Sequence, residues 1–463
     1  MRCPALLVAA PASGQGKTTV AAGLARLLAR RGWRVRAFKC GPDYVDGGWL
    51  QAASGAPVHN LDLWMTGEPD VRARLHQAAS SADAILIEGV MGLHDGEPSS
   101  AALARRLGIP VLAVVQAEAM AQTLGAVVLG LRGYGASDVD PLPWAGVLAN
   151  GVGSTGHAAL LQSALQPGDG WLGHLPRDAA LGLPERDAGV LATPEASADQ
   201  ALARLDAIAD RLAQTPLGRL TLDDWRRRWS VRFPAPAAAP RLPTLLAGCT
   251  IAVAHDAAFA CVYPANVETL QALGARVVCF SPLAGDALSD CDALWLPGGD
   301  AGRYAGRLAE CVDLHAQLRA HARAGRPIWA EGGGLPLLLD ELVDGAGASH
   351  RMSGVLPGSA RVQPHLMGLG LQQWQPMAEV PALRGHAFHR VRVEAGLEPI
   401  GFTQVGVGAN PRPGEAIHAV AGGRPVRGSL FQPWLASSPR LAAWLFGAGL
   451  DASTGAAGVR CHA

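Results

Sequence analysis

The stretch Ala5–Gly32, "ALLVAAPASGQGKTTVAAGLARLLARRG", decides the fold of the first half of the chain. It begins with an apolar run typical of a buried strand, passes through a loop of small residues, and ends in a segment with the apolar spacing of a helix. Lys17 and Thr18 fall where the helix starts. This order of strand, small-residue loop, Lys-Thr pair and helix predicts a phosphate-binding loop.

Such a loop binds phosphate through its backbone N–H groups and the N-terminus of the helix. Lys17 adds a positive charge and Thr18 a hydroxyl that suits Mg2+. The strict pattern asks for glycine where this chain has Pro11, so only the structural context supports the motif. We expect ATP to be bound by Ser13, Gly14, Gln15, Gly16, Lys17, Thr18 and Thr19.

Four carboxylates follow the next predicted strands. Asp43 and Asp46 come just after the second strand, and Glu88 and Asp95 lie at and after the end of the third. Strand ends on one edge of a parallel sheet converge on the ligand crevice. Carboxylates beside a triphosphate repel it unless a cation lies between them, which predicts Mg2+ bound directly or through water. The alternative is that these residues only form turns in solvent.

Composition limits the remaining possibilities. The chain has 463 residues, 49% of them hydrophobic, which is enough for two or three domains with cores. Lys+Arg and Asp+Glu are equal at 39 each and form no long blocks, which argues against nucleic-acid or anionic-membrane binding. Eight scattered cysteines without a CxxC pair fit reduced thiols, so we expect a cytoplasmic protein. No apolar run reaches the length of a membrane span.

Strand-like and helix-like segments alternate in two blocks, which predicts an α/β protein with two domains and mainly parallel sheets. A Pro/Ala-rich segment without amphipathic period separates the blocks. We therefore predict a first domain at 1–232, a linker at 233–248, a second domain at 249–450 and a poorly ordered tail at 451–463.

Several motifs together resemble one family. In order and spacing, the chain resembles the cobyrinic acid a,c-diamide synthase family, amidases of the corrin ring in cobalamin biosynthesis. The resemblance spans nearly the whole chain, and it rests on "APASGQGKTT", "FKCGPDYVD", "NLDLWM", "EGVMGLHDG", "LPRD" and "LPERD".

The resemblance implies an N-terminal P-loop NTPase domain with a dethiobiotin-synthetase-like parallel sheet. It also implies a C-terminal flavodoxin-like class I glutamine amidotransferase fold. ATP would phosphorylate a carboxylate of the macrocycle, and ammonia would displace the phosphate.

The resemblance also implies roles for the residues named above. Lys17, Asp43, Asp46, Glu88 and Asp95 would be catalytic. The expected metal ligands are Thr18, Asp43 and Glu88, and Asn150 would read the adenine edge.

Three points stay open. Asn150 also suits a satisfied strand end, and Lys39 suits either a phosphate or carboxylate contact or an exposed surface position. After Asp46 the chain lacks the usual proline and histidine, and Asp187 replaces a common histidine. These departures weaken any inference about which macrocycle is bound.

The segment Ile328–Leu338, "IWAEGGGLPLL", reads as the strand-turn-helix elbow that presents a nucleophile in several α/β enzymes. The family's elbow reads like "AECGG", and the residue in the cysteine position here is Gly332. Gln432 and Trp434 stand where the family has histidines, although Gly298 and Gly299 keep the oxyanion turn in outline. Glycine cannot form a thioester, so we predict a glutaminase-like domain without glutaminase activity.

The sequence thus predicts an ATP- and Mg2+-dependent ligase that amidates a corrinoid or other tetrapyrrole polycarboxylate. Its nitrogen would come from free ammonia or from a separate glutaminase, and we expect a homodimer. One alternative is a non-catalytic, ATP-dependent tetrapyrrole-binding protein or partner subunit, against which the retained carboxylates argue. Another is an amidoligase acting on a different macrocycle such as nickel-sirohydrochlorin.

Overall fold

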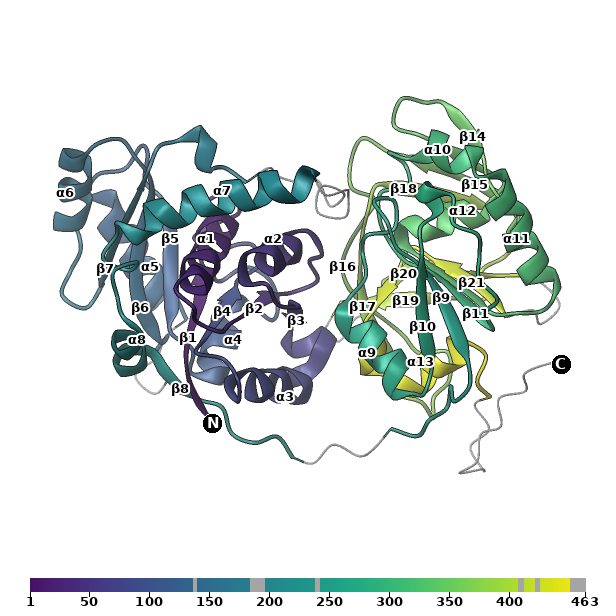
Figure 1. Cartoon of the computed structure of the whole chain (residues 1–463), viewed down its shortest axis with the longest axis horizontal. Coiled ribbons are helices and arrows are strands. Elements are labelled where there is room, and N and C mark those ends of the chain that lie inside the picture. The colour runs from purple at the N-terminus through teal and green to yellow at the C-terminus, as the bar shows by residue number, and fades with distance from the viewer. Residues whose placement is uncertain (136–139, 184–195, 238–241, 407–411, 421–424, 450–463) are drawn as a thin grey trace. The chain divides into compact units, whose positions relative to one another are not determined.

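The computed structural model describes residues 1–135, 140–183, 196–237, 242–406, 412–420 and 425–449. The predicted tail at 451–463 and Asp187 lie outside this range. The chain forms two compact units that divide close to residue 240 (Figure 1). Each unit is described by itself.

The first unit is built on a parallel sheet with the strand order β3-β2-β4-β1-β5-β6-β7, and β8 pairs antiparallel with the start of β1. β1 and β4 are buried almost along their whole length, as expected for strands covered on both faces. The strands are β1 (Arg2–Ala9), β2 (Val35–Cys40), β3 (His59–Leu61), β4 (Ala84–Glu88), β5 (Val111–Gln116), β6 (Trp144–Val152), β7 (Trp171–Pro176) and β8 (Ser230–Arg232).

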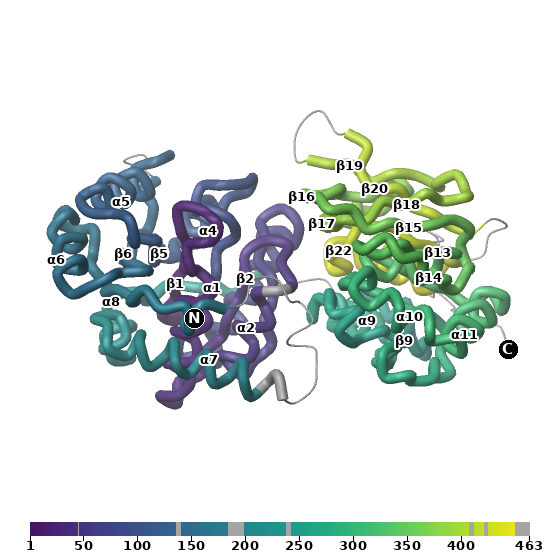
Figure 2. The backbone as a smooth tube through the Cα atoms, turned by 90° about the horizontal axis from the view of Figure 1, so that it is seen from above, coloured from purple at the N-terminus to yellow at the C-terminus, as the bar shows by residue number. Residues whose placement is uncertain are grey.

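Helices lie on both faces of this sheet (Figures 1 and 2). They are α1 (Lys17–Arg30), α2 (Val45–Ser54), α3 (Glu68–Ala79), α4 (Ser100–Leu107), α5 (Thr123–Gly133), α6 (Thr155–Ser163), α7 (Ala196–Ala213) and α8 (Leu222–Trp229), with short turns η1 (Leu63–Gly67) and η2 (Ala179–Leu181). Because consecutive strands run parallel, the loops after β1, β2, β4, β5 and β6 all leave from one edge of the sheet.

The second unit has a larger sheet whose parallel half follows the order β10-β9-β11-β12-β21. Numbered along the chain this order is 2-1-3-4-5, the flavodoxin-like arrangement. The sheet continues through the antiparallel strands β20-β19-β16-β17-β22, and a small sheet has the order β14-β13-β15-β18 (Figure 2). The fold class predicted from the sequence is confirmed for both units.

The strands of the second unit are β9 (Thr250–Ala254), β10 (Arg276–Phe280), β11 (Ala293–Leu296), β12 (Ile328–Glu331), β13 (Glu341–Val343), β14 (Ser349–Arg351), β15 (Gly358–Val362), β16 (Gly368–Trp374), β17 (Leu383–His389), β18 (Val391–Ala395), β19 (Gly401–Val405), β20 (Arg412–Ala419), β21 (Val426–Ser429) and β22 (Gln432–Pro433). Its helices and turns are α9 (Pro264–Ala272), η3 (Pro282–Ala284), α10 (Ala305–Glu310), α11 (Val312–Arg323), η4 (Gly332–Gly334), α12 (Leu335–Leu338), η5 (Leu435–Ser437) and α13 (Pro439–Leu445).

Each unit has its own apolar core. In the first unit the core lies between the sheet and its helices, and in the second it lies on both faces of the large sheet. Within the described ranges, no helix combines the length and the apolarity needed to cross a membrane.

Candidate active site

The phosphate loop leaves β1 after Ala9 and ends where α1 begins at Lys17. Gly14 and Gly16 have φ values of +74° and +92°, which only glycine adopts at little cost. No side chain caps the N-terminus of α1, and its first turn carries no acidic residue. The first N–H groups of the helix therefore carry no side-chain cap, which is compatible with the predicted phosphate binding.

Lys17 is 8% exposed, and its Nζ donates a hydrogen bond to the backbone oxygen of Ala12 at 3.1 Å. Burial and the nearby charge of Lys39 lower the pKa of Lys17. This hydrogen bond is made within the phosphate loop itself, so the ammonium can turn to a phosphate without breaking the packing of the protein.

Glu88, the last residue of β4, lies at the centre of a buried polar cluster. Its Oε1 accepts hydrogen bonds from the Thr18 hydroxyl at 2.6 Å and from Lys39 Nζ at 3.0 Å. Lys39, from β2, is only 2% exposed, and its ammonium also bonds Asp46 Oδ2 at 2.6 Å and lies 3.6 Å from Asp43 Oδ2. The surface alternative for Lys39 is therefore wrong. Residues at the ends of β2, α2 and β4 thus meet at the Lys39 ammonium.

The electrostatics of this cluster follow from burial and from Lys39. Burial raises the pKa of Glu88 to about 7, against the opposing effect of the Lys39 ammonium. Burial also raises the pKa of Asp43. For Asp46, burial acts to raise the pKa, but Lys39 outweighs it and the pKa is lowered. Burial acts to lower the pKa of Lys39, and the three carboxylates outweigh it and raise that pKa. The cluster thus consists of one buried ammonium and three carboxylates whose pKa values depend on burial and on one another.

Asn60, in β3, holds the loop that carries Asp43. Its Nδ2 donates to the backbone oxygens of Gly41 and Asp43, both at 2.8 Å. The Asp46 N–H in turn donates to Asp43 Oδ1 at 3.1 Å. Sequence reasoning quoted Asn60 only as part of a motif and gave it no role, because nothing in the residue order shows that β3 lies beside β2.

Asp95 lies near the other carboxylates but differs from them. It is exposed, its Oδ2 accepts a hydrogen bond from the Gly92 N–H at 2.9 Å, and its charge acts to raise the pKa of Lys17. Asp95 therefore shapes the loop after β4 and adds negative charge near Lys17.

Asn150 lies within β6 and packs on the phosphate loop. Its Nδ2 donates to the backbone oxygen of Gln15 at 3.1 Å, while Gln15 Oε1 accepts from the Gln116 N–H at 2.9 Å. The loop is thus fastened to the ends of β5 and β6. This contact gives Asn150 a structural task, and its predicted contact with adenine stays a prediction.

The residues fit a magnesium ion at one point. Glu88 Oε2 is buried and has no hydrogen-bond partner among the described residues, and the Thr18 hydroxyl lies beside the same carboxylate. Mg2+ bound to a nucleotide often uses only one or two protein carboxylates together with phosphate oxygens and water. No trio of His, Cys, Asp or Glu in the described part of the chain is arranged as a metal site by itself.

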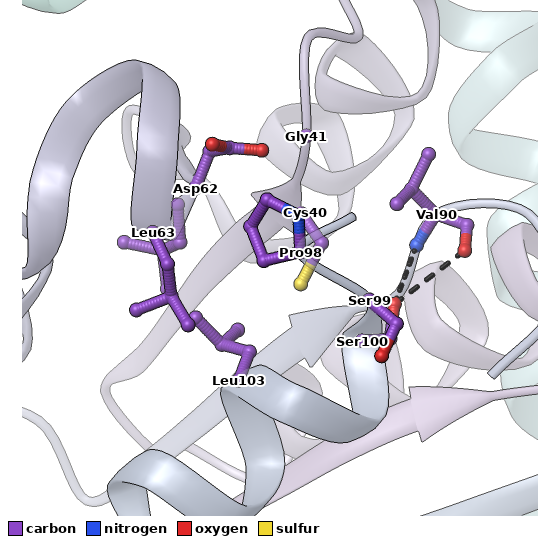
Figure 3. A pocket seen from close by; sticks show the side chains of 10 residues that line it. Cys40, Gly41, Asp62, Leu63, Val90, Pro98, Ser99, Ser100 and Leu103 are labelled. Carbon is purple, nitrogen blue, oxygen red and sulfur yellow. Dashed lines mark hydrogen bonds between the residues drawn. The ribbon is translucent and has the colours of Figure 1, made fainter. Parts of the chain in front are cut away.

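A small cavity adjoins the cluster, lined by Cys40, Gly41, Asp62, Leu63, Val90, Pro98, Ser99, Ser100 and Leu103 among others (Figure 3). Its volume of about 10 Å³ admits roughly one water molecule. The Ser100 hydroxyl bridges the Val90 N–H and carbonyl at 3.1 and 3.4 Å. The cavity is too small for a nucleotide or a macrocycle.

In the second unit the elbow has the predicted form of β12, the turn η4 and the short helix α12. Gly332 is buried with φ +50°, and a Cβ added at Gly333 would lie 2.2 Å from the Gly299 carbonyl oxygen. The elbow therefore packs closely on the turn at Gly298–Gly299. Its backbone is that of a nucleophile elbow, and residue 332 carries no side chain.

The Gln432 side chain fills the space beside Gly332. A Cβ at Gly332 would lie 3.0 Å from Gln432 Nε2, and a Cβ at Gly298 would lie 2.8 Å from Gln432 Oε1. Gln432 is 4% exposed, and its Oε1 has no hydrogen-bond partner among the residues described. The Gln432 carboxamide thus lies between the elbow at Gly332 and the turn at Gly298–Gly299.

Two further residues lie close to Gln432. His386 pairs with it across β17 and β22, and burial lowers the pKa of His386 to about 3, which makes it a weak base. Cys261 donates its N–H to the Gly298 carbonyl at 2.9 Å, and its Cβ would lie 3.2 Å from a Cβ at Gly298. Cys261 thus lies beside the turn at Gly298–Gly299, on a different element from the elbow.

Comparisons with known proteins agree on both units. Residues 6–190 match the CobQ/CobB/MinD/ParA nucleotide binding domain, and residues 250–418 match the CobB/CobQ-like glutamine amidotransferase domain. The chain is 48% identical over 457 residues to hydrogenobyrinate a,c-diamide synthase of Pseudomonas aeruginosa, covering 97% of this chain and 99% of that protein. The chain belongs to the hydrogenobyrinate/cobyrinate a,c-diamide synthase family.

Other members of the a,c-diamide synthase family are also similar. The hydrogenobyrinate a,c-diamide synthase of Stutzerimonas stutzeri is 50% identical over 401 residues, covering 86% of this chain and 89% of that protein. The cobyrinate a,c-diamide synthase of Salmonella typhimurium is 37% identical over 410 residues, covering 83% and 85%. Membership of the a,c-diamide synthase family makes this chain a ligase that forms C–N bonds, as the sequence predicted.

Gly16 gives a test of the phosphate loop of this a,c-diamide synthase family member. A Cβ added there would lie 2.4 Å from Asn150 Nδ2, at a φ that alanine rarely adopts. We expect Gly16→Ala to weaken ATP binding at least about tenfold, because the loop must shift away from Asn150. Calorimetric titration with ATP measures this. Gly32→Ala is the control, since Gly32 also has a positive φ of +81° but no atom within 4 Å of its Cβ position. Equal ATP affinities for the two variants would contradict the prediction.

Proposed function

We propose that this chain amidates the a and c side-chain carboxylates of hydrogenobyrinic or cobyrinic acid, with ATP and Mg2+, through an acyl phosphate. The nitrogen comes from ammonia. Three features support the proposal: the phosphate loop with Lys17, the buried carboxylate cluster on the same sheet edge, and relatives whose names state this reaction.

The chemistry needs mainly positioning and charge neutralisation. A carboxylate is a poor acyl donor because oxide is a poor leaving group, whereas phosphate leaves readily. Lys17 and the N–H groups at the start of α1 bind the phosphates and stabilise the charge that develops during transfer. Thr18 and Glu88 would hold Mg2+, which neutralises charge on the phosphate oxygens. Lys39 stays in place because Asp43, Asp46 and Glu88 surround it.

The two chemical steps balance without any further reactant. A substrate carboxylate oxygen attacks the γ-phosphorus, the bond to the β-phosphate oxygen breaks, and ADP leaves. Ammonia then attacks the acyl carbon, the C–O bond to phosphate breaks, and the nitrogen loses a proton as the amide forms. The raised pKa of Asp43 suits it to receive that proton.

The nitrogen source is inferred from the elbow. Glutamine hydrolysis needs a thiolate or an equivalent nucleophile and a base. Gly332 has no side chain, Gln432 fills the space beside it, and His386 is a weak base. The single observation that supports the ammonia route best is Gln432, because its carboxamide lies where the amide of a bound glutamine would have to approach residue 332.

The test is amide formation on hydrogenobyrinic and on cobyrinic acid with ATP, MgCl2 and either ammonium chloride or glutamine, followed by mass. We expect a mass loss of about one dalton per amide with ammonium, and no product with glutamine alone. Cys261→Ala should behave as the wild type does, because Cys261 lies on another element than the elbow. Turnover of glutamine that disappears in Cys261→Ala would mean that this cysteine has taken over as nucleophile, and the ammonia route would fall.

A further inference from the structure

Met91, in the loop after β4, has a backbone conformation that its side chain disfavours. Its φ is +48°, and it is the one residue other than glycine with a positive φ in the described ranges. The left-handed region costs free energy for a residue with a Cβ and almost none for glycine. Glycine is abundant in this chain, with 57 residues, so its absence here requires a reason in the side chain.

Burial does not supply that reason. Met91 is 45% exposed, and Leu93, two residues later, is 1% exposed and belongs to the core. The terminal methyl group of Met91 lies over the loop, since a Cβ at Gly96 would be 3.0 Å from Met91 Cε. The strained residue therefore presents a thioether side chain to solvent.

The loop that carries Met91 is fixed beside the ligase site. The Gly89 N–H donates to the Val8 carbonyl at 2.8 Å, and the Leu93 N–H donates to the Ala10 carbonyl at 2.7 Å. A Cβ at Gly92 would lie 2.5 Å from the Pro11 carbonyl oxygen, so the loop rests against the first residues of the phosphate loop. Met91 thus lies on a loop that follows Glu88 closely and rests against the start of the phosphate loop, and its side chain is exposed.

We propose that Met91 is a substrate-positioning residue that packs against the apolar face of the macrocycle. This inference rests on the proposed function. The reacting carboxylate must reach the γ-phosphate, and it is attached by a short arm to the edge of a large ring with apolar faces, so the ring lies just outside the phosphate site. Methionine suits this contact because its unbranched, polarisable side chain adapts to an irregular apolar surface. The backbone strain fixes the direction in which the side chain leaves the loop.

Two variants compare the loss of both the side chain and the strain with the retention of both. Met91→Gly removes both, and Met91→Leu keeps an apolar side chain of similar size. We expect Met91→Gly to raise KM for the macrocycle about tenfold, the loss that goes with one methionine-sized apolar contact. KM for ATP should stay within about twofold, and the thermal midpoint should be equal to or above that of the wild type. Met91→Leu should keep KM for the macrocycle within about threefold.

The matched control is Leu129→Ala, which removes a 55% exposed apolar side chain from α5 and should change neither KM. Binding of the macrocycle without ATP, followed by its absorbance, measures the contact independently of catalysis. Wild-type binding without amide formation would overturn the proposed function, and the titration of Met91→Gly would still decide the inference. Equal macrocycle affinities for wild type and Met91→Gly, or a loss confined to ATP, would overturn the inference.

Discussion

Lys39→Met will lower the free energy of unfolding by about 3–5 kcal/mol at pH 7, the cost of leaving buried charges without their partner. Lys39 is 2% exposed and faces three carboxylates, with Nζ 2.6 Å from Asp46 and 3.0 Å from Glu88. Without the ammonium these carboxylates repel one another in a buried place. The pKa of Glu88, already raised to about 7, will rise further, and the uptake of a proton will limit the loss.

Thermal and denaturant unfolding measure the effect of Lys39→Met. Arg34→Met is the control: the Arg34 side chain makes two hydrogen bonds to Asp83, but it is 70% exposed, and we expect a loss of at most about 1 kcal/mol. The prediction fails if the two variants lose the same stability. That result would mean that water reaches the cluster and that Lys39 is not the element that holds it together.

Lys17→Ala will reduce kcat for amidation by at least about 100- to 1000-fold while the thermal midpoint stays nearly unchanged. The reason is the asymmetry of its contacts. In the protein alone the Lys17 ammonium donates one hydrogen bond to the Ala12 carbonyl, within the phosphate loop. During phosphoryl transfer it faces the negative charge that develops on the phosphate. Loss of this charge therefore affects the reaction far more than the fold.

Release of ADP, coupled to amide formation, measures the effect of Lys17→Ala. Arg30→Ala, at the other end of the same helix, removes a cation that forms exposed ion pairs with Asp206 and Asp210. It should leave kcat within about twofold. A rate for Lys17→Ala above about one tenth of the wild-type rate would exclude the proposed role of Lys17.

The sequence predicted the parts of the site that depend on neighbours along the chain. The phosphate loop followed from a strand, two glycines and a Lys-Thr pair at the start of a helix. Glu88 could be placed because a residue at the end of a buried parallel strand must face the ligand edge. The elbow at Gly332 was predicted for the same reason, since strand, turn and helix follow one another directly.

Contacts between distant segments could not be predicted in this way. Lys39 looked equally suited to solvent, because residue order does not show that β2, β4 and the loop with Asp43 enclose one side chain. The antiparallel extension of the large sheet beyond β21 was missed, because pairs such as β16–β19 and β17–β22 join segments that are distant in the sequence. The position of Gln432 beside Gly332 depends on that pairing, so sequence reasoning named both residues but not their contact.

The most direct test of the account is competition between two nitrogen donors. The wild-type chain is given hydrogenobyrinic acid, ATP and MgCl2 with [amide-15N]glutamine and unlabelled ammonium at equal concentration, and the 15N content of the diamide is read by mass. The account predicts a diamide without 15N, because no nucleophile at residue 332 can release the glutamine nitrogen. A diamide that carries 15N in proportion to the added glutamine would contradict it.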